Sequence, residues 1–120
     1  MDVNALLEQI KNHPGYEKVG MVLCHQGVVR ATSRDGRPVR GLKVAVDEAR
    51  LEKTISDKKK MPGVVEILVR INAGRDLKVG DDVMALVVAG DIRENVIAAL
   101  SETLNAIKSE VTRKTEYFVE

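Results

Sequence analysis

Several residue types are scarce in this 120-residue chain, and each scarcity excludes a class of function. There is no tryptophan and aromatic residues make up only 2% of the chain, so the base-stacking platforms of RNA-binding proteins are not expected. The only cysteine, Cys24, excludes an internal disulfide, and its apolar surroundings predict a buried, inert thiol. The two histidines, His13 and His25, lie far apart in the chain, so we expect no metal site and no cofactor.

Neither sign of charge dominates, and long apolar runs are missing. The formal net charge of +1 gives no reason to expect a nucleic acid or an acidic membrane surface as a partner. No run approaches the roughly 18 apolar residues of a membrane span, and no basic start followed by a long apolar stretch marks a signal peptide. We therefore expect a cytoplasmic protein, with residues 1–120 forming a single domain around one modest core.

The clearest pattern in the chain is a strand that runs directly into a helix. Residues 83–89 are continuously apolar, which predicts a strand buried on both faces. Apolar residues then recur at helical spacing over residues 92–107. Asp91 and Glu94 have the spacing of a capping box, so the helix is predicted to begin at this point.

The other predicted elements are shorter and less regular. Helix, strand, strand, helix and strand follow one another over residues 3–10, 19–30, 39–46, 47–60 and 64–71. An Asp-Gly turn at residues 35–36 predicts that the first two strands form an antiparallel hairpin. Residues 72–80 are predicted to be a loop, and the apolar tail at 117–119 is expected to dock on its own domain or on a partner. This order indicates an α+β domain with a largely antiparallel sheet and about three helices.

Cations at the ends of the predicted elements are the candidates for chemistry. Arg30 closes the first strand, Arg93 opens the last helix, and Lys108 and Lys114 lie on or beyond the last turns of that helix. If the sheet places the end of the first strand beside the start of the last helix, two arginines converge on one anion, such as a phosphate. A lysine in such a cationic pocket would have its protonated form disfavoured, which suits a base or a nucleophile.

Arg93 has two interpretations. In the first turn of a helix, an arginine together with the free backbone N–H groups would bind an anion well. The alternative is that Arg93 only pairs with Asp91 or Glu94 at the surface, which would contribute roughly 0–1 kcal/mol. His25, within an apolar strand, is interpreted as a core or interface histidine rather than a catalyst.

The order and spacing of several short motifs resemble the large, catalytic subunit of molybdopterin synthase. The family's strand ending in Gly-x-Val-Arg is matched by residues 27–30, and its Leu-x-Val-Gly-Asp loop by residues 77–81. Its arginine at a helix start and its lysine near the end of that helix are matched by Arg93 and Lys108. The similarity runs from about residue 14 to residue 116, which is most of the chain.

The resemblance implies an α/β-hammerhead fold and a role in molybdenum cofactor biosynthesis. In this family a small ubiquitin-like sulfur carrier inserts its C-terminal Gly-Gly thiocarboxylate into the large subunit, and sulfur passes to cyclic pyranopterin monophosphate to form molybdopterin. The resemblance implies that Arg30 and Arg93 bind the substrate phosphate, that Lys108 assists sulfur transfer, and that Lys114 matches the family's second lysine. We also expect a homodimer, or a heterotetramer with the carrier, because a sheet this apolar on both faces needs covering.

Departures from the family pattern leave two alternatives open. Ile92 stands where the family has a histidine before its arginine, and isoleucine neither hydrogen-bonds through its side chain nor carries a proton. One alternative is a catalytically impaired relative that binds a phosphate, a pterin or a protein partner. The other is a dimeric scaffold without a ligand, in which Arg30 and Arg93 are surface residues.

Overall fold

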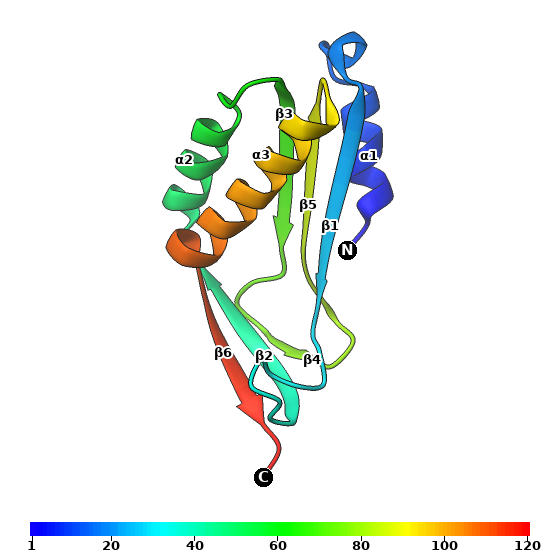
Figure 1. The fold of residues 1–120 in the computed structure, drawn as a ribbon. Helices are drawn as coiled ribbons and strands as arrows, with labels where there is room; N and C mark the ends of the chain where they lie inside the picture. The colour runs from blue at the N-terminus through cyan, green and yellow to red at the C-terminus, as the bar shows by residue number, and fades with distance from the viewer.

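Two three-stranded antiparallel sheets organise the chain, and the computed structural model describes all residues from 1 to 120. The first sheet has the order β1-β5-β3, formed by Met21–Val28, Asp82–Gly90 and Val64–Ile71. The second has the order β4-β2-β6, formed by Asp76–Lys78, Val39–Val46 and Thr112–Phe118. Figure 1 shows the second sheet extending from the end of the first, so that the molecule measures 52 × 25 × 24 Å. The predicted α+β class with antiparallel pairing is confirmed.

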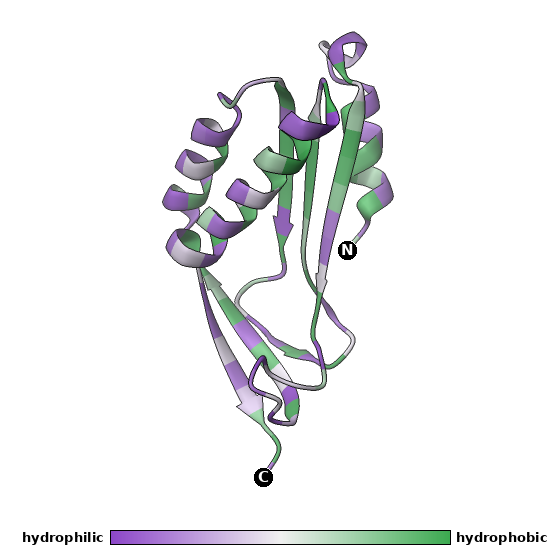
Figure 2. Cartoon of the chain, in the orientation of Figure 1, coloured by the Kyte–Doolittle hydropathy of each residue, from purple (hydrophilic) through white to green (hydrophobic).

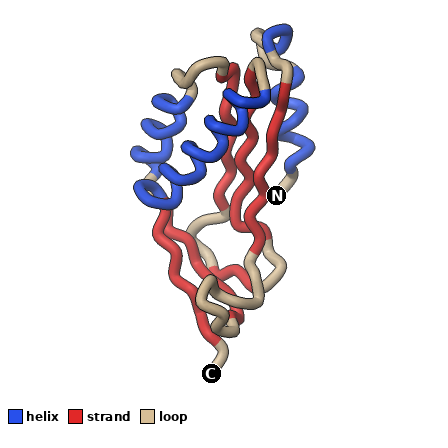
Figure 3. Tube along the Cα trace, viewed as in Figure 1, coloured by secondary structure: helices blue, strands red, loops and turns tan.

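Three helices cover the first sheet. Helix α1 (Val3–Lys11) lies on one face, and α2 (Glu48–Lys58) and α3 (Arg93–Ala106) lie on the other (Figures 1 and 3). A π-helical turn, Ile107–Val111, follows α3 and leads into β6. None of the helices combines the length and the apolar character that a membrane span requires.

Strand β5 lies at the centre of the first sheet and is buried on both faces. Ala85, Val87 and Ala89 pack under α1, whereas Leu86 and Val88 join the core under α3. All five side chains are inaccessible to solvent. Alternate residues on a strand point to opposite faces, so covering both faces requires the continuous apolar run seen in the sequence and in Figure 2.

The start of α3 differs from the prediction. The expected capping box between Asp91 and Glu94 is absent, and the N-cap is Ile92, which offers no side-chain acceptor. Asp91 Oδ1 instead accepts from the Ile92 N–H at 2.6 Å and from Asn95 Nδ2 at 2.9 Å. These bonds, that of Asn95 first, lower the pKa of the Asp91 carboxyl. The carboxylate therefore tethers the β5–α3 junction, one residue earlier than a capping residue would stand.

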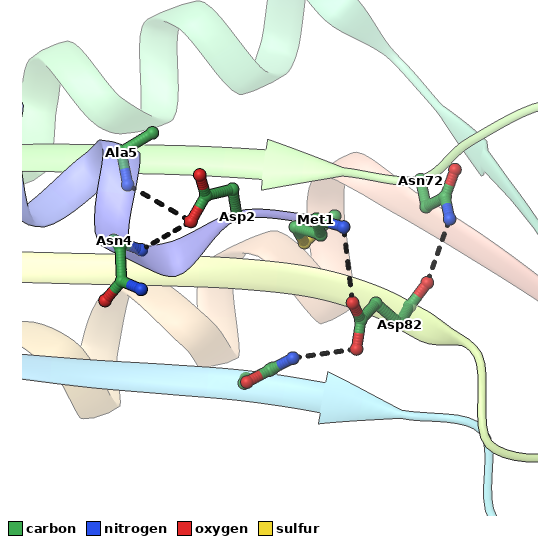
Figure 4. Close-up of polar contacts among 7 residues, drawn as sticks. Met1, Asp2, Asn4, Ala5, Asn72 and Asp82 are labelled. Atoms are coloured by element: carbon green, nitrogen blue, oxygen red, sulfur yellow. Dashed lines mark hydrogen bonds and ion pairs between the residues drawn. The ribbon is translucent and has the colours of Figure 1, made fainter.

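Helix α1 begins at Val3, the residue at which the sequence predicts it. Asp2 caps the helix, because its Oδ1 accepts from the backbone N–H groups of Asn4 and Ala5 at 2.9 and 3.4 Å (Figure 4). The amino group of Met1 lies 3.4 Å from the carboxylate of Asp82, at the first residue of β5 (Figure 4). This contact and the apolar face of α1 fix the helix along the central strand.

The predicted hairpin between residues 19–30 and 39–46 does not form. Strand β1 pairs only with β5, and β2 pairs with β4 and β6. The turn itself is present, with Gly36 at φ +85°, but it closes a local loop rather than two adjacent strands. Side-chain packing decides the partner, because Leu42 of β2 is buried against Leu77 of β4 in a separate core cluster. Residues 72–80 therefore contain a strand, and residues 112–118 form β6 instead of an irregular tail.

Cys24 is a further correction. It was expected to be buried, but its side chain is exposed on the edge strand β1. In the register with β5, Cys24 lies opposite Val87, on the face of the sheet that α1 covers. It remains exposed because β1 is the edge strand, a position that an apolar sequence run does not reveal. Its partial burial still raises the pKa of the thiol.

Candidate functional site

A cavity of about 290 Å³ lies where the two sheets meet. Strands β1, β2, β3 and β5 supply an apolar wall that includes Leu42, Ile71 and Met84. The polar part of the lining comes from β1 and the loop before β2, and from the π-helical turn with the start of β6, more than seventy residues further along the chain: His25, Arg34, Lys108, Thr112 and Lys114. The fold thus brings both lysines that were predicted from the sequence into one cavity.

The π-helical turn positions Lys108. Ile107 and Val111, at the two ends of the turn, are 0% and 4% exposed and belong to the core under α3. The Thr112 hydroxyl donates to the Ile107 carbonyl at 3.2 Å and ties the turn to the first residue of β6. With its two ends buried, the turn holds Lys108 on the exposed side, at the cavity. Local π-helical geometry of this kind is frequently found at functional sites.

Strand pairing positions Lys114. In the antiparallel register of β6 with β2, Lys114 lies opposite Val44, which is itself part of the cavity wall. The ammonium group has one acidic neighbour, Glu116, at 4.0 Å. Because this pair is long and the Lys114 side chain is half exposed, the pair contributes little, and the ammonium group of Lys114 remains available to a ligand.

The charge in the cavity is of one sign. Arg34, Lys108 and Lys114 line it, and no carboxylate does. Burial, and then the charge of Lys108, lower the pKa of His25 below its usual value of 6.5, so this imidazole is neutral at pH 7. A larger hollow of about 530 Å³ on the second sheet contains the carboxylates of Asp76 and Asp81, so its charge is mixed. The cavity at the sheet junction is therefore the one suited to an anion.

The predicted convergence of Arg30 and Arg93 is wrong within a single chain. Met21 lies opposite Gly90, so it is the start of β1 that stands beside the start of α3. Arg30 follows the other end of β1, and eight strand residues at about 3.3 Å each put roughly 25 Å between the two arginines. Arg93 is exposed at the surface, with Nε 3.5 Å from the Glu94 carboxylate. This agrees with the alternative interpretation of Arg93 as a surface residue.

Arg30 lies near the cavity but does not line it. Its Nε donates to the carbonyl of Thr32 at 2.8 Å, and its side chain is exposed. Val28, two residues earlier, is part of the lining. Arg30 thus follows a lining residue closely in the chain, but its side chain is held by the Thr32 carbonyl and does not contribute to the lining.

Two polar residues of the cavity were not predicted as site residues. His25 was interpreted as a core or interface residue, and Arg34 only as part of a turn. The alternation of a strand places His25 on the same face as Gly27, and this pattern was available from the sequence. In the structure both residues line the cavity. Nothing local in the sequence places the loop that carries Arg34 against the end of α3.

Comparison with known families identifies the chain. The sequence model of the family described as MoaE protein matches residues 1–110. The chain belongs to the MoaE family. This family takes part in molybdenum cofactor biosynthesis, and the resemblance seen in the sequence, to the large subunit of molybdopterin synthase, is confirmed. A comparison with curated proteins finds no match.

Solved structures of MoaE proteins share the fold. The protein from Burkholderia multivorans is 23% identical with a TM-score of 0.76, over 99% of this chain and 84% of its own. Molybdopterin synthase from Staphylococcus aureus is 22% identical with a TM-score of 0.72, over 87% of this chain and 78% of its own. A complex of subunits 1 and 2 of molybdopterin-converting factor from Helicobacter pylori is 21% identical with a TM-score of 0.70, over 100% of this chain and 85% of its own. At these identities the likeness shows the MoaE fold.

Proposed function

We propose that this protein is the large subunit of a molybdopterin synthase, which transfers sulfur from the thiocarboxylate of a small ubiquitin-like carrier to cyclic pyranopterin monophosphate. The observation that carries the proposal is the cavity at the sheet junction, which Lys108 and Lys114 both line and to whose lining no carboxylate contributes. Both reactants are anions, and fixed cations in a partly enclosed site stabilise negative charge far better than water-exposed ones. The two-subunit complex known from Helicobacter pylori supports a carrier as the partner.

The two lysines have complementary roles in this proposal. Lys108, on the π-helical turn, faces the reacting sulfur and assists its transfer. Lys114, on β6, contacts the phosphate or the thiocarboxylate from the opposite wall. Each charge-assisted hydrogen bond of this kind is worth about 1.5–3 kcal/mol, which is enough to select a dianion over a neutral pterin.

The arginines join this site in different ways. Arg30 reaches the cavity if it releases the Thr32 carbonyl. Arg93 stands fifteen residues from Lys108 at the other end of α3, about 22 Å away along the helix axis. It can therefore meet the cavity only from a second copy of the chain, which makes its phosphate-binding role dependent on the homodimer predicted from the sequence.

Dithiolene formation tests the proposal. Purified protein is mixed with thiocarboxylated carrier and cyclic pyranopterin monophosphate, and molybdopterin is quantified. We expect product with the wild-type protein and loss of at least about tenfold in rate with Lys108→Ala, since one lost charged contact costs more than 1.4 kcal/mol. Lys58→Ala, on α2 and remote from the cavity, is the matched control and should leave the rate unchanged. Equal rates for Lys108→Ala and wild type would remove Lys108 from the reaction.

A second function, binding without turnover, is favoured by one observation. Ile92, which stands where the family has a histidine, is 54% exposed at the start of α3, so an apolar side chain occupies an exposed position suited to a polar one. A protein that binds the carrier and the phosphorylated pterin but forms no product would be such a module. The same assay separates the two functions when carrier binding is measured in parallel.

A further inference from the structure

His25 is the one group of the cavity that titrates near neutral pH. It lies on β1, opposite Leu86 of β5, with its ring toward the space between the sheets. The ring is partly buried, and no hydrogen bond to another protein group satisfies its nitrogens. A neutral imidazole has one donor and one acceptor nitrogen, so the ring can hydrogen-bond a ligand that enters the cavity.

Every charged side chain that lines the cavity around His25 is a cation. Lys108 faces it from the π-helical turn, Lys114 lines the same cavity from β6, and Arg34 lines it from the loop before β2. The neighbouring strands β3 and β5 contribute only apolar side chains to the lining. Without an anion, a proton on His25 would add a fourth positive charge to the three of Arg34, Lys108 and Lys114.

We propose that His25 is a ligand-binding residue of the cavity, which contacts the anion held by Lys108 and Lys114 and takes up a proton as that anion binds. The inference rests on the proposed function for the identity of the natural ligand, but not for the coupling itself. The geometry supports it, because a dianion between the two lysines cancels the charge that disfavours a protonated imidazole.

The present pKa of His25 agrees with this coupling. Burial and the charge of Lys108 hold the pKa of His25 below 6.5. A bound dianion reverses the second of these causes, so the pKa rises on binding. By linkage, the anion then binds more tightly as the pH falls through the range in which His25 titrates.

His13 provides an internal control, because it is the only other histidine in the chain. Its Nδ1 accepts from the Gly15 N–H at 2.9 Å, and its Nε2 lies 3.5 Å from the Glu66 carboxylate. None of these groups lines the cavity. An anion in the cavity should therefore leave the imidazole NMR signals of His13 unaffected.

The test uses inorganic sulfate, which stays a dianion throughout the titration range, and follows the two imidazole signals by NMR from pH 5 to 8. His13→Gln assigns the signals. We expect saturating sulfate to raise the pKa of His25 and not that of His13. In calorimetry, sulfate should bind at least about threefold more tightly at pH 5.5 than at pH 7.5, a preference that His25→Gln abolishes and His13→Gln retains.

Two results would overturn the inference. If sulfate shifts the signals of Lys108 and Lys114 but not the pKa of His25, the imidazole does not contact the anion, while the proposed function stands. If sulfate does not bind, the cavity is not an anion site and both fall. Loss of molybdopterin formation together with an intact sulfate–His25 coupling would instead refute the proposed reaction and leave His25 as part of an anion site.

Discussion

Ile107→Ala is predicted to lower the free energy of unfolding more than a truncation of the same size at the surface. Ile107 is completely buried at the start of the π-helical turn, in the core under α3. Truncating a fully buried isoleucine to alanine costs about 2–5 kcal/mol, from lost transfer energy and from the cavity left behind. Because the turn is anchored at both ends, it cannot collapse freely, and we expect about 3–4 kcal/mol.

The same change gives a thermal signature. For a 120-residue chain the unfolding entropy near the midpoint is about 0.25 kcal/mol/K, so 3 kcal/mol corresponds to roughly 12 °C in Tm. Urea unfolding followed by circular dichroism gives the free energy directly, and an unchanged m-value shows that the two-state comparison is valid. Ile107→Val should cost only about 1 kcal/mol, because a single methyl group is removed.

Ile97 provides a matched control. It is an isoleucine on α3, the helix that leads into the turn, but its side chain is 49% exposed. Ile97→Ala should therefore cost less than about 1 kcal/mol. If Ile107→Ala and Ile97→Ala were equally destabilising, or if Ile107→Ala cost less than about 1 kcal/mol, the turn would not be held by its buried end, and the account of how Lys108 is positioned would fail.

Three further predictions concern the stability of the folded chain. Asp2→Ala should cost about 1 kcal/mol in urea unfolding because it removes the N-cap of α1, and an unchanged midpoint would contradict the cap. Gly63→Ala should cost at least about 2 kcal/mol, since φ is +75° and the new Cβ meets the Asp91 carboxylate; Gly74→Ala, at φ +78° with open space around it, should cost only about 1 kcal/mol. The lowered pKa of His25 means that the unfolded chain takes up a proton first as the pH falls below 6.5, so the free energy of unfolding should drop from there through the folded pKa, and His25→Gln should drop less.

Local patterns in the sequence were sufficient for the elements that bury one apolar stripe or one apolar run. The strand over residues 83–89, the helix that follows it and the Asp2-capped helix are all present. Each is held by apolar contacts of its own residues, and the spacing of those residues in the sequence predicts them. The start of α3 differs in detail from the prediction because Asp91 Oδ1 accepts from the Ile92 N–H and from the Asn95 side chain, so it forms no capping box with Glu94.

Strand pairing could not be predicted from the same patterns. The turn at Gly36 suggested a hairpin, but β2 pairs with β6, a strand about seventy residues further along the chain whose charged residues gave it no strand-like alternation. Pairing between such distant segments is decided by the packing of Leu42 and Val44 in their own core cluster. For the same reason the cavity was only partly foreseen: Lys108 and Lys114 meet there, whereas Arg93 lies at the far end of α3.

The most direct test of the central claim is the affinity of the cavity for cyclic pyranopterin monophosphate, measured by calorimetry. The double variant Lys108→Met, Lys114→Met keeps the side-chain length but removes both charges, and loss of two charge-assisted contacts predicts at least a hundredfold weaker binding. The control Lys58→Met, Lys60→Met, at the last residue of α2 and two residues beyond it, should bind as the wild type does. A double variant at the cavity that binds within twofold of the wild type would contradict the account.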